Sequence, residues 1–272
     1  MINLIIGKNS NLSSNLADKI TNSVLISSRE LAEDLSILDE FKNKIVNIVF
    51  NNFQPATSLN DFENLGCYIE NSIGNTAKIL DSLGKNIRVN KIIYTSSSSV
   101  YGNNILCNED DELMPLNLHA SLKVSNEKLI EMYCLKNSID FTIARIFNMY
   151  GGNDKFSIIT KIIDAAKKQN DLTIINNGNA LRDFIHIDDV TEIYAKLLKI
   201  KNIKFINIGT GSGSSIKNIL DFLQNNNIKI RTKNIEREEL KISTADIQKL
   251  RKLLKKEKFL KVEDYLKKEL NI

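Results

Sequence analysis

The sequence predicts an α/β protein built on a doubly wound, mostly parallel sheet with a smaller mixed α/β lobe. Two observations lead to this prediction. Short apolar, β-branched segments alternate with helical patterns through the first 150 residues, an order typical of parallel sheets covered by helices on both faces. After Tyr150 the Gly151-Gly152 pair interrupts this pattern, and a different set of short elements follows. We therefore expect one domain over 1–150, joined by parts of 184–210, and a second lobe made of 151–183 and 211–272.

The individual elements follow from apolar periodicity. In the first half we expect strands at 3–6, 24–26, 45–50, 91–95 and 141–146, and helices at 12–20, 31–41, about 65–83 and 121–136. In the second half we expect helices at 156–169, 188–199 and 215–224, a strand early in 172–190, a strand at 204–208, and a helical tail from Thr244. The stretch between Ile26 and Ile45 is short for two crossovers, so we expect one strand of the usual set to be lost or reduced there.

Composition excludes several classes of protein. The 37 Lys and Arg residues exceed the 33 Asp and Glu residues by only four, and the one concentrated basic tract, 249–261, alternates with Leu and Glu, which disfavours a nucleic-acid partner. No apolar run reaches the roughly 18 residues of a membrane span. Three Cys residues without metal-type spacing and only two His residues argue against a metal site and favour free thiols in a reducing, cytoplasmic setting.

The segment Ile5–Ser13 forms a strand, turn and helix start of the kind that binds a dinucleotide. Such turns usually carry three glycines, and here Gly7 is followed by Ser10 and Ser13 in the other two places. Serine is small and its hydroxyl can donate to phosphate, while a helix N-terminus favours an anion. The candidate cofactor residues in this segment are Gly7, Ser10, Asn11 and Leu12. The alternative is an ordinary strand-to-helix turn.

The end of the second expected strand reads Ile26-Ser27-Ser28-Arg29. An NAD site usually has an Asp or Glu here for the ribose 2′-hydroxyl. Two hydroxyls and an Arg in place of an acid suit a 2′-phosphate, so Ser27, Ser28 and Arg29 favour NADP(H) over NAD(H). The alternative for Arg29 is a surface residue before a helix.

Five later segments share an order and spacing. They are KIIYTSSSSVYG (91–102), PLNLHASLK (115–123), ARIFNMYG (144–151), LRDFIHIDDV (181–190) and FINIGTG (205–211). Together they resemble the extended short-chain dehydrogenase/reductase family, and within it the epimerase/dehydratase/reductase branch that acts on nucleotide sugars. The resemblance runs from about Met1 to Gly213 and implies a Rossmann-type domain with a substrate-binding lobe.

The resemblance also implies catalytic roles. The family uses a Ser or Thr, a Tyr, and a Lys four residues after the Tyr, which places both on one face of a helix. Here Lys123 matches the Lys, Ser97 the hydroxyl, and Ser98 the hydroxyl if the register slips or else a substrate contact. The Tyr position is occupied by His119, and none of the seven tyrosines has a Lys four residues later. We expect either altered catalysis through a neutral imidazole or a retained fold that has lost activity.

Further residues are assigned by the same resemblance. Asn71 matches a position near the cofactor, Asn148 one near the substrate diphosphate, and Arg182 one that commonly contacts that diphosphate. Arg145 is either part of the substrate site or a structural ion-pair partner.

The activity expected from these residues is NADPH-linked reduction of a 4-keto nucleotide-diphosphate sugar. An epimerase and a catalytically silent nucleotide-binding member are the alternatives. Dehydration is disfavoured because the serine turn lacks the acidic pair that dehydratases of this family use. The resemblance also implies a homodimer that pairs the helices at about 65–83 and 121–136 in a four-helix interface.

Overall fold

The structure, a computed structural model, describes residues 1–51, 64–83 and 87–272. The chain forms two compact units, and each is assembled from separated segments. Unit 1 contains Met1–Val100, Glu112–Arg145 and Thr191–Ile206. Unit 2 contains Tyr101–Asp111, Ile146–Val190 and Asn207–Ile272. The short segment 101–111 therefore clusters with the second unit, although it lies within the sequence range expected for the first domain.

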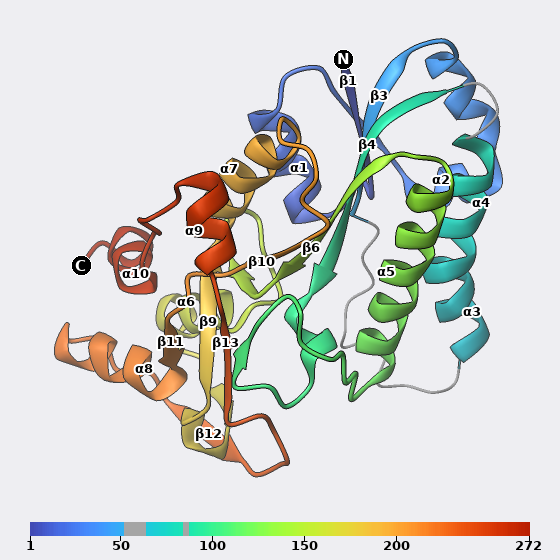
Figure 1. Cartoon of the computed structure of the whole chain (residues 1–272). Helices are drawn as coiled ribbons and strands as arrows, with labels where there is room; N and C mark the ends of the chain where they lie inside the picture. The colour runs from blue at the N-terminus through green and yellow to red at the C-terminus, as the bar shows by residue number, and fades with distance from the viewer. Residues whose placement is uncertain (52–63, 84–86) are drawn as a thin grey trace. The chain divides into compact units, whose positions relative to one another are not determined.

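A six-stranded parallel sheet forms the centre of unit 1 (Figure 1), which confirms the predicted fold class. Its strand order is β10-β6-β4-β3-β1-β2, so the order reverses between β1 and β3. The strands are β1 (Ile2–Ile6), β2 (Ser23–Ile26), β3 (Ile45–Phe50), β4 (Arg88–Ser97), β6 (Asp140–Ile146) and β10 (Phe205–Ile208). Because all strands run in one direction, their carboxyl ends lie together at one edge of the sheet.

Helices cover both faces of this sheet, with α2, α4 and α5 on one side and α1 on the other (Figure 1). The helices are α1 (Asn11–Lys19), α2 (Ser28–Glu33), α3 (Leu65–Ile69), α4 (Asn75–Leu83), α5 (Leu118–Lys136) and α7 (Ile187–Leu197). A π-helical turn, η4 (Glu70–Gly74), joins α3 to α4. None of the helices in the described part of the chain combines the length and the apolar composition that a membrane span requires.

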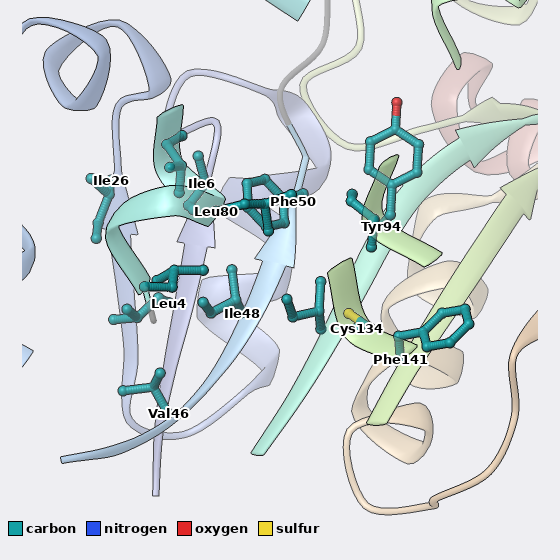
Figure 2. Close-up of a cluster of buried hydrophobic side chains, with 14 of the residues drawn as sticks. Leu4, Ile6, Ile26, Val46, Ile48, Phe50, Leu80, Tyr94, Cys134 and Phe141 are labelled. Atoms are coloured by element: carbon teal, nitrogen blue, oxygen red, sulfur yellow. The ribbon is translucent and has the colours of Figure 1, made fainter. Parts of the chain in front are cut away.

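Alternate residues of the strands build the larger core, as expected for side chains that repeat every second residue along a strand. Figure 2 shows Leu4, Ile6, Ile48 and Phe50 from neighbouring strands beside Leu80 of α4. All five are almost completely buried. Burial of each such side chain contributes roughly 1.5–3 kcal/mol, so this face holds the helices in place.

Unit 2 is built on a mixed five-stranded sheet in which β9 is paired with three strands. Strand β11 is antiparallel to β9, whereas β7 and β13 are parallel to it. The elements are β5 (Leu106–Cys107), β7 (Asn148–Tyr150), β9 (Leu181–His186), β11 (Gly213–Ser215), β13 (Ile242–Ala245), the separate pair β8 (Leu172–Ile175) and β12 (Thr232–Ile235), and the helices α6 (Ile158–Lys168), α8 (Ile216–Asn225), α9 (Gln248–Leu254) and α10 (Val262–Leu270).

Three predicted elements need correction. The helix expected at 31–41 is instead α2 followed by a 3-10 segment (Leu35–Phe41), because Asp34 is extended and its carboxylate accepts from the Ser36 N–H. The long helix begins at Leu118 rather than Ser121, since the Asn117 side chain caps it. The tail is not helical from Thr244, because β13 extends to Ala245. The residues between β2 and β3, all of them described, form no strand, as the short crossover predicted.

Candidate functional site

The site of unit 1 lies at the carboxyl edge of the parallel sheet, where β1 and β3 end side by side. Gly7 follows β1 with a φ of +112°, a conformation that strongly favours glycine. Its N–H and that of Lys8 donate to the Ile26 carbonyl at the end of β2. The N–H of Asn51, which follows β3, donates to the Ile6 carbonyl. Ligands of doubly wound folds bind where the strand order reverses, and this is such a position.

Helix α1 begins directly after this turn. Ser10 caps it, with its Oγ accepting from the Ser13 N–H at 3.0 Å. Asn11 and Leu12 are its first two residues, and Leu12 is buried. The candidate residues of this segment are thus placed together at the N-terminus of a nine-residue helix.

The end of β2 has a second capped helix. The Ser27 Oγ accepts from the Glu30 N–H, so Ser27 is the N-cap of α2 and Glu30 occupies the third helical position. Ser28 and Arg29 form the first turn, and Arg29 is exposed. Sequence reasoning missed the Ser-x-x-Glu capping box signature at 27–30. The Ser27 oxygen accepts a helix N–H, while the exposed guanidinium of Arg29 is available to an anion.

The residues that the sequence predicts to be catalytic lie on the serine turn and on α5. Ser97 ends β4, and its Oγ accepts from the Ser99 N–H and hydroxyl. Ser97 and Ser98 are both half-buried. Lys123 is buried, and its Nζ donates to the Thr95 carbonyl at 2.8 Å. The same ammonium lies 5.0 Å from the centre of the Tyr94 ring, a cation–π distance. Lys123 is thereby attached to the end of the serine strand.

His119 lies one turn before Lys123, in the first turn of α5. Burial, with a smaller effect of the nearby Lys123 charge, lowers the pKa of His119 to about 4. Burial lowers the pKa of Lys123 to about 8, and the Glu127 charge acts in the opposite direction. Near neutral pH the imidazole is therefore neutral and the ammonium is still mainly charged. A neutral imidazole can accept or donate a hydrogen bond, but it is a poorer proton source than imidazolium.

Arg145 is an ion-pair partner of Glu127, which decides between the two roles that its sequence position allowed. Its Nη2 lies 2.9 Å from Oε2 of Glu127, and its Nε donates to Oε1 at 3.2 Å. Oε1 also accepts from the Ser96 hydroxyl. All three side chains are buried. The pair joins α5 to β4 and β6, one turn beyond Lys123. Sequence reasoning missed Glu127, although it lies four residues after Lys123 on the same helical face.

Asn71, the remaining cofactor candidate of unit 1, lies in the π-helical turn η4 and is half-buried. Its Nδ2 donates to Cys67 Sγ at 3.1 Å. The next residue, Ser72, accepts from the buried Asn126 of α5 at 2.8 Å. Asn126 therefore connects the segment that contains Asn71 to the helix that contains Lys123.

The two substrate candidates of unit 2 lie on neighbouring strands. Asn148 is on β7, and its Nδ2 donates to the Asp183 carbonyl of β9 at 3.2 Å. Arg182, on β9, has Ser214 and Ser243 as its cross-strand neighbours. Its Nη2 lies 3.0 Å from Oε2 of Glu239, and Nη1 donates to the Leu181 carbonyl. Sequence reasoning missed this counter-ion, since the two residues lie 57 positions apart.

Asp183 is a buried carboxylate of this unit that accepts several hydrogen bonds. It is fully buried and accepts from the Thr210 hydroxyl and from the N–H groups of Thr210, Gly211 and Ala245. Burial raises its pKa, while these hydrogen bonds oppose the rise. Asp183 therefore attaches the glycine-rich turn after β10 to β9, a structural role that leaves Arg182 as the anion-binding candidate.

Comparison with known proteins identifies one family. The model of the NAD dependent epimerase/dehydratase family matches residues 10–209. Among curated proteins, the chain is 30% identical over 200 residues to UDP-glucuronate 4-epimerase of Thermodesulfobacterium geofontis, covering 71% of this chain and 61% of that protein. It is 31% identical over 174 residues to Protein CapI of Staphylococcus aureus, covering 61% and 50% respectively. The chain thus spans roughly half to two thirds of the length of these relatives.

Solved structures share the fold at lower sequence identity. UDP-glucuronic acid 4-epimerase from Bacillus cereus, in complex with UDP-glucuronic acid and NAD, superposes with a TM-score of 0.84 at 23% identity, covering 100% of this chain and 98% of that one. MoeE5 in complex with UDP-glucose and NAD gives a TM-score of 0.86 at 21% identity, with the same coverage.

Proposed function

This chain belongs to the NAD dependent epimerase/dehydratase family, and from that premise we propose that it is a nicotinamide-dependent 4-epimerase of a nucleotide-diphosphate sugar. The observation that carries the proposal is Lys123, a buried ammonium attached to the serine strand at Thr95, one helical turn after His119. The names of the relatives support epimerisation over the net reduction that the sequence favoured, since two of the curated relatives are described as 4-epimerases, one of them putative.

The residues at the carboxyl edge of unit 1 fit a dinucleotide. Gly7 adopts the positive φ of a tight turn, and the N-terminus of α1 follows it with only small side chains at positions 10 and 13. The turn at Gly7 and the start of α1 at Ser10, Asn11 and Leu12 would form the pyrophosphate site, and Ser27, Ser28 and Arg29 the site of the adenosine ribose. Lys123 and Asn71 would contact the nicotinamide half. When bound, the nicotinamide would supply a reversible hydride acceptor for the sugar.

Side chains of the protein would bind the substrate and transfer the proton. The Lys123 ammonium orients the nicotinamide ribose, and the imidazole of His119 one turn earlier is neutral before substrate binds. The neutral His119 accepts the proton of the sugar hydroxyl and returns it after the sugar has turned. Ser97 donates a hydrogen bond to the same oxygen, with Ser98 beside it. In unit 2, Arg182 binds the diphosphate as a planar, charged donor, and Asn148 supports it from the neighbouring strand.

A second candidate is NADPH-linked reduction of a nucleotide 4-ketosugar. One observation favours it: the end of β2 presents Ser27, Ser28 and the exposed Arg29 in place of an acid. The solved structures of MoeE5 and of the Bacillus cereus 4-epimerase contain NAD, which favours the epimerase.

The two activities differ in how much cofactor they consume. We would incubate the chain with UDP-glucose or UDP-glucuronic acid and catalytic NAD, and separately with a nucleotide 4-ketosugar and excess NADPH. Formation of the 4-epimer without net change in reduced nicotinamide supports the epimerase. Oxidation of one NADPH per sugar identifies the reductase. No turnover in either assay, together with no cofactor-induced thermal shift, identifies a silent member of the family.

Arg29 provides a prediction about cofactor choice. If it contacts a 2′-phosphate, Arg29→Ala should weaken NADP(H) binding by about tenfold, because a charge-assisted contact is lost, and should leave NAD(H) binding unchanged. Calorimetric titration of both cofactors measures this. Arg88→Ala is the matched control. Arg88 is also exposed, and it begins β4, at the edge of the sheet opposite the carboxyl ends of the strands. Equal weakening for both cofactors would contradict a 2′-phosphate contact.

Arg182 provides a prediction about the substrate. Arg182→Ala should weaken UDP or TDP binding by about 1.5–3 kcal/mol, the range for a lost hydrogen bond to a charged group. Isothermal titration of UDP, TDP, GDP and CDP measures it. Arg231→Ala removes an exposed Arg of the same unit that pairs with Asp171, and should leave the affinities unchanged. If the two variants behave alike, the diphosphate binds elsewhere.

We also propose that the chain forms a homodimer through α3, η4, α4 and α5. Three large apolar side chains of these helices are highly exposed, namely Ile69 (47%), Met132 (69%) and Leu135 (55%). We expect a species of twice the chain mass in sedimentation at micromolar concentration, and a single-chain species for Met132→Asp/Leu135→Asp. Leu253→Asp, at an exposed apolar position of α9, is the control and should sediment like the parent.

A further inference from the structure

A cluster of three hydrogen-bonding side chains occupies the switch point of the parallel sheet. Asn51 follows β3, while Ser10 and Ser13 lie at the start of α1, directly after β1. The Nδ2 of Asn51 donates to Ser10 Oγ at 2.6 Å and to Ser13 Oγ at 2.9 Å. Ser13 and Asn51 are buried, with exposed fractions of 0% and 4%. The cluster therefore joins the end of β3 to the start of α1, at the point where the strand order reverses.

The two serines are engaged with each other as well as with Asn51. The Ser10 hydroxyl donates to Ser13 Oγ at 3.0 Å and accepts from the Ser13 N–H. It also accepts from Asn51, so its one proton and two lone pairs are all in use. In this arrangement Ser10 is not a donor toward a phosphate, the role that its hydroxyl suggested in the sequence. Its function is to hold the first turn of α1.

These positions are the second and third glycine positions of the dinucleotide motif. Glycines there let the backbone approach the pyrophosphate and let helix and strand pack closely. Ser10 and Ser13 each add a hydroxymethyl group at these positions, so α1 cannot approach the strands as closely as it could with glycines. Here the hydroxyls are bound by one amide from the neighbouring strand, so the start of α1 is held to the end of β3 by hydrogen bonds.

From this geometry we propose that Asn51 is a positioning residue for the cofactor: it fixes the first turn of α1 through Ser10 and Ser13, in place of the missing glycines. The inference rests on the proposed function, since it assumes that the cofactor pyrophosphate binds at this helix start. It assigns a role to Asn51 that depends on the two serines and that disappears when they are glycines.

A double-mutant cycle in cofactor binding tests this dependence. Asn51→Ala in the parent should weaken NAD(H) and NADP(H) binding about tenfold, the effect of about 1.4 kcal/mol expected for a displaced binding turn. In the Ser10→Gly/Ser13→Gly background, the same substitution should change the dissociation constant less than about twofold. Both dissociation constants come from calorimetry without turnover, and thermal unfolding of each variant establishes that it is folded.

Asn47 provides a matched control on β3, the strand that Asn51 follows. It is also a buried Asn (4% exposed), bonded through its side chain to Asn3 and Asn90. Asn47→Ala should lower the melting temperature and leave cofactor affinity unchanged. If Asn51→Ala weakens binding equally in both backgrounds, or behaves like Asn47→Ala, the positioning role is overturned. A parent chain that binds no nicotinamide cofactor would instead refute the proposed function, and the inference with it.

Discussion

Replacing Lys123 with Met should cause the largest loss of activity of any single substitution in this chain. Lys123 is buried and attached to the Thr95 carbonyl, so its ammonium has a fixed position beside the serine strand. Methionine keeps the length and apolar body of the side chain but removes the charge. We expect a loss of turnover greater than the roughly 10²–10⁴-fold typical of removing one proton-transfer group, accompanied by weaker cofactor binding, because both orientation and charge are lost. His119→Ala should fall within the range for one such group.

The pH dependence of turnover follows from the same two residues. Because the pKa of Lys123 is lowered to about 8, raising the pH through 8 neutralises the ammonium, and kcat/KM should fall. Because the pKa of His119 is lowered to about 4, the imidazole stays neutral from about pH 5 upward and should add no acidic limb between pH 5 and 8. Rates measured from pH 5 to 10 provide the profile. An unchanged rate above pH 9 would exclude a required Lys123 ammonium.

Replacing His119 with Tyr, the residue that the family resemblance implies at this position, distinguishes the possible states of the site. A site rebuilt around imidazole should lose activity, because the longer Tyr displaces the sugar, and this is the result we expect. A gain in turnover would show that the site is degenerate but intact. Absence of turnover in both forms, across a panel of nucleotide sugars and nucleotide 4-ketosugars with both cofactors, would favour a binding-only protein.

Among the substitutions proposed for this protein, Glu127→Ala should cause the largest decrease in the free energy of unfolding. The substitution leaves the Arg145 guanidinium buried without its carboxylate, and removing one partner of a buried ion pair costs about 3–5 kcal/mol. Urea unfolding followed by circular dichroism measures the change in free energy of unfolding. Glu131→Ala, on the same helix, is the control: Glu131 pairs with the exposed Lys128, so its loss should cost at most about 1 kcal/mol.

Replacing both Glu127 and Arg145 tests whether the stability loss of Glu127→Ala comes from the unpaired Arg145 charge. Glu127→Met/Arg145→Met removes both charges and keeps apolar volume, so it should recover most of the lost stability. If the double variant is no more stable than Glu127→Ala, the cost does not come from an uncompensated buried charge.

Much of the architecture could be predicted because it depends on neighbours in the sequence. The nearly continuous apolar, β-branched run at 45–50 determined β3 to the residue, and the order of strands and helices determined the parallel sheet. The four-residue interval between His119 and Lys123 places both on one face of any helix that contains them. The helix ends were less predictable, because a single side chain decides them: Asn117 begins α5 three residues early, and Asp34 separates α2 from the 3-10 segment.

The partners of the polar site residues were decided only by the tertiary structure. Arg145 had two possible roles in the sequence, and burial beside Glu127 selected the ion pair. The sequence suggests Ser10 as a phosphate donor, but in the fold its hydroxyl proton is donated to Ser13 and one of its lone pairs accepts from Asn51, 41 residues away. Arg182 has Glu239 as its counter-ion, 57 residues away. A hydrogen bond or ion pair requires two side chains to be close in space, and the periodicity of a sequence does not predict which distant side chains will be close. Apolar burial is nearly independent of which apolar residue is the neighbour, so the sequence alone determined the layers of this protein, and packing determined its polar contacts.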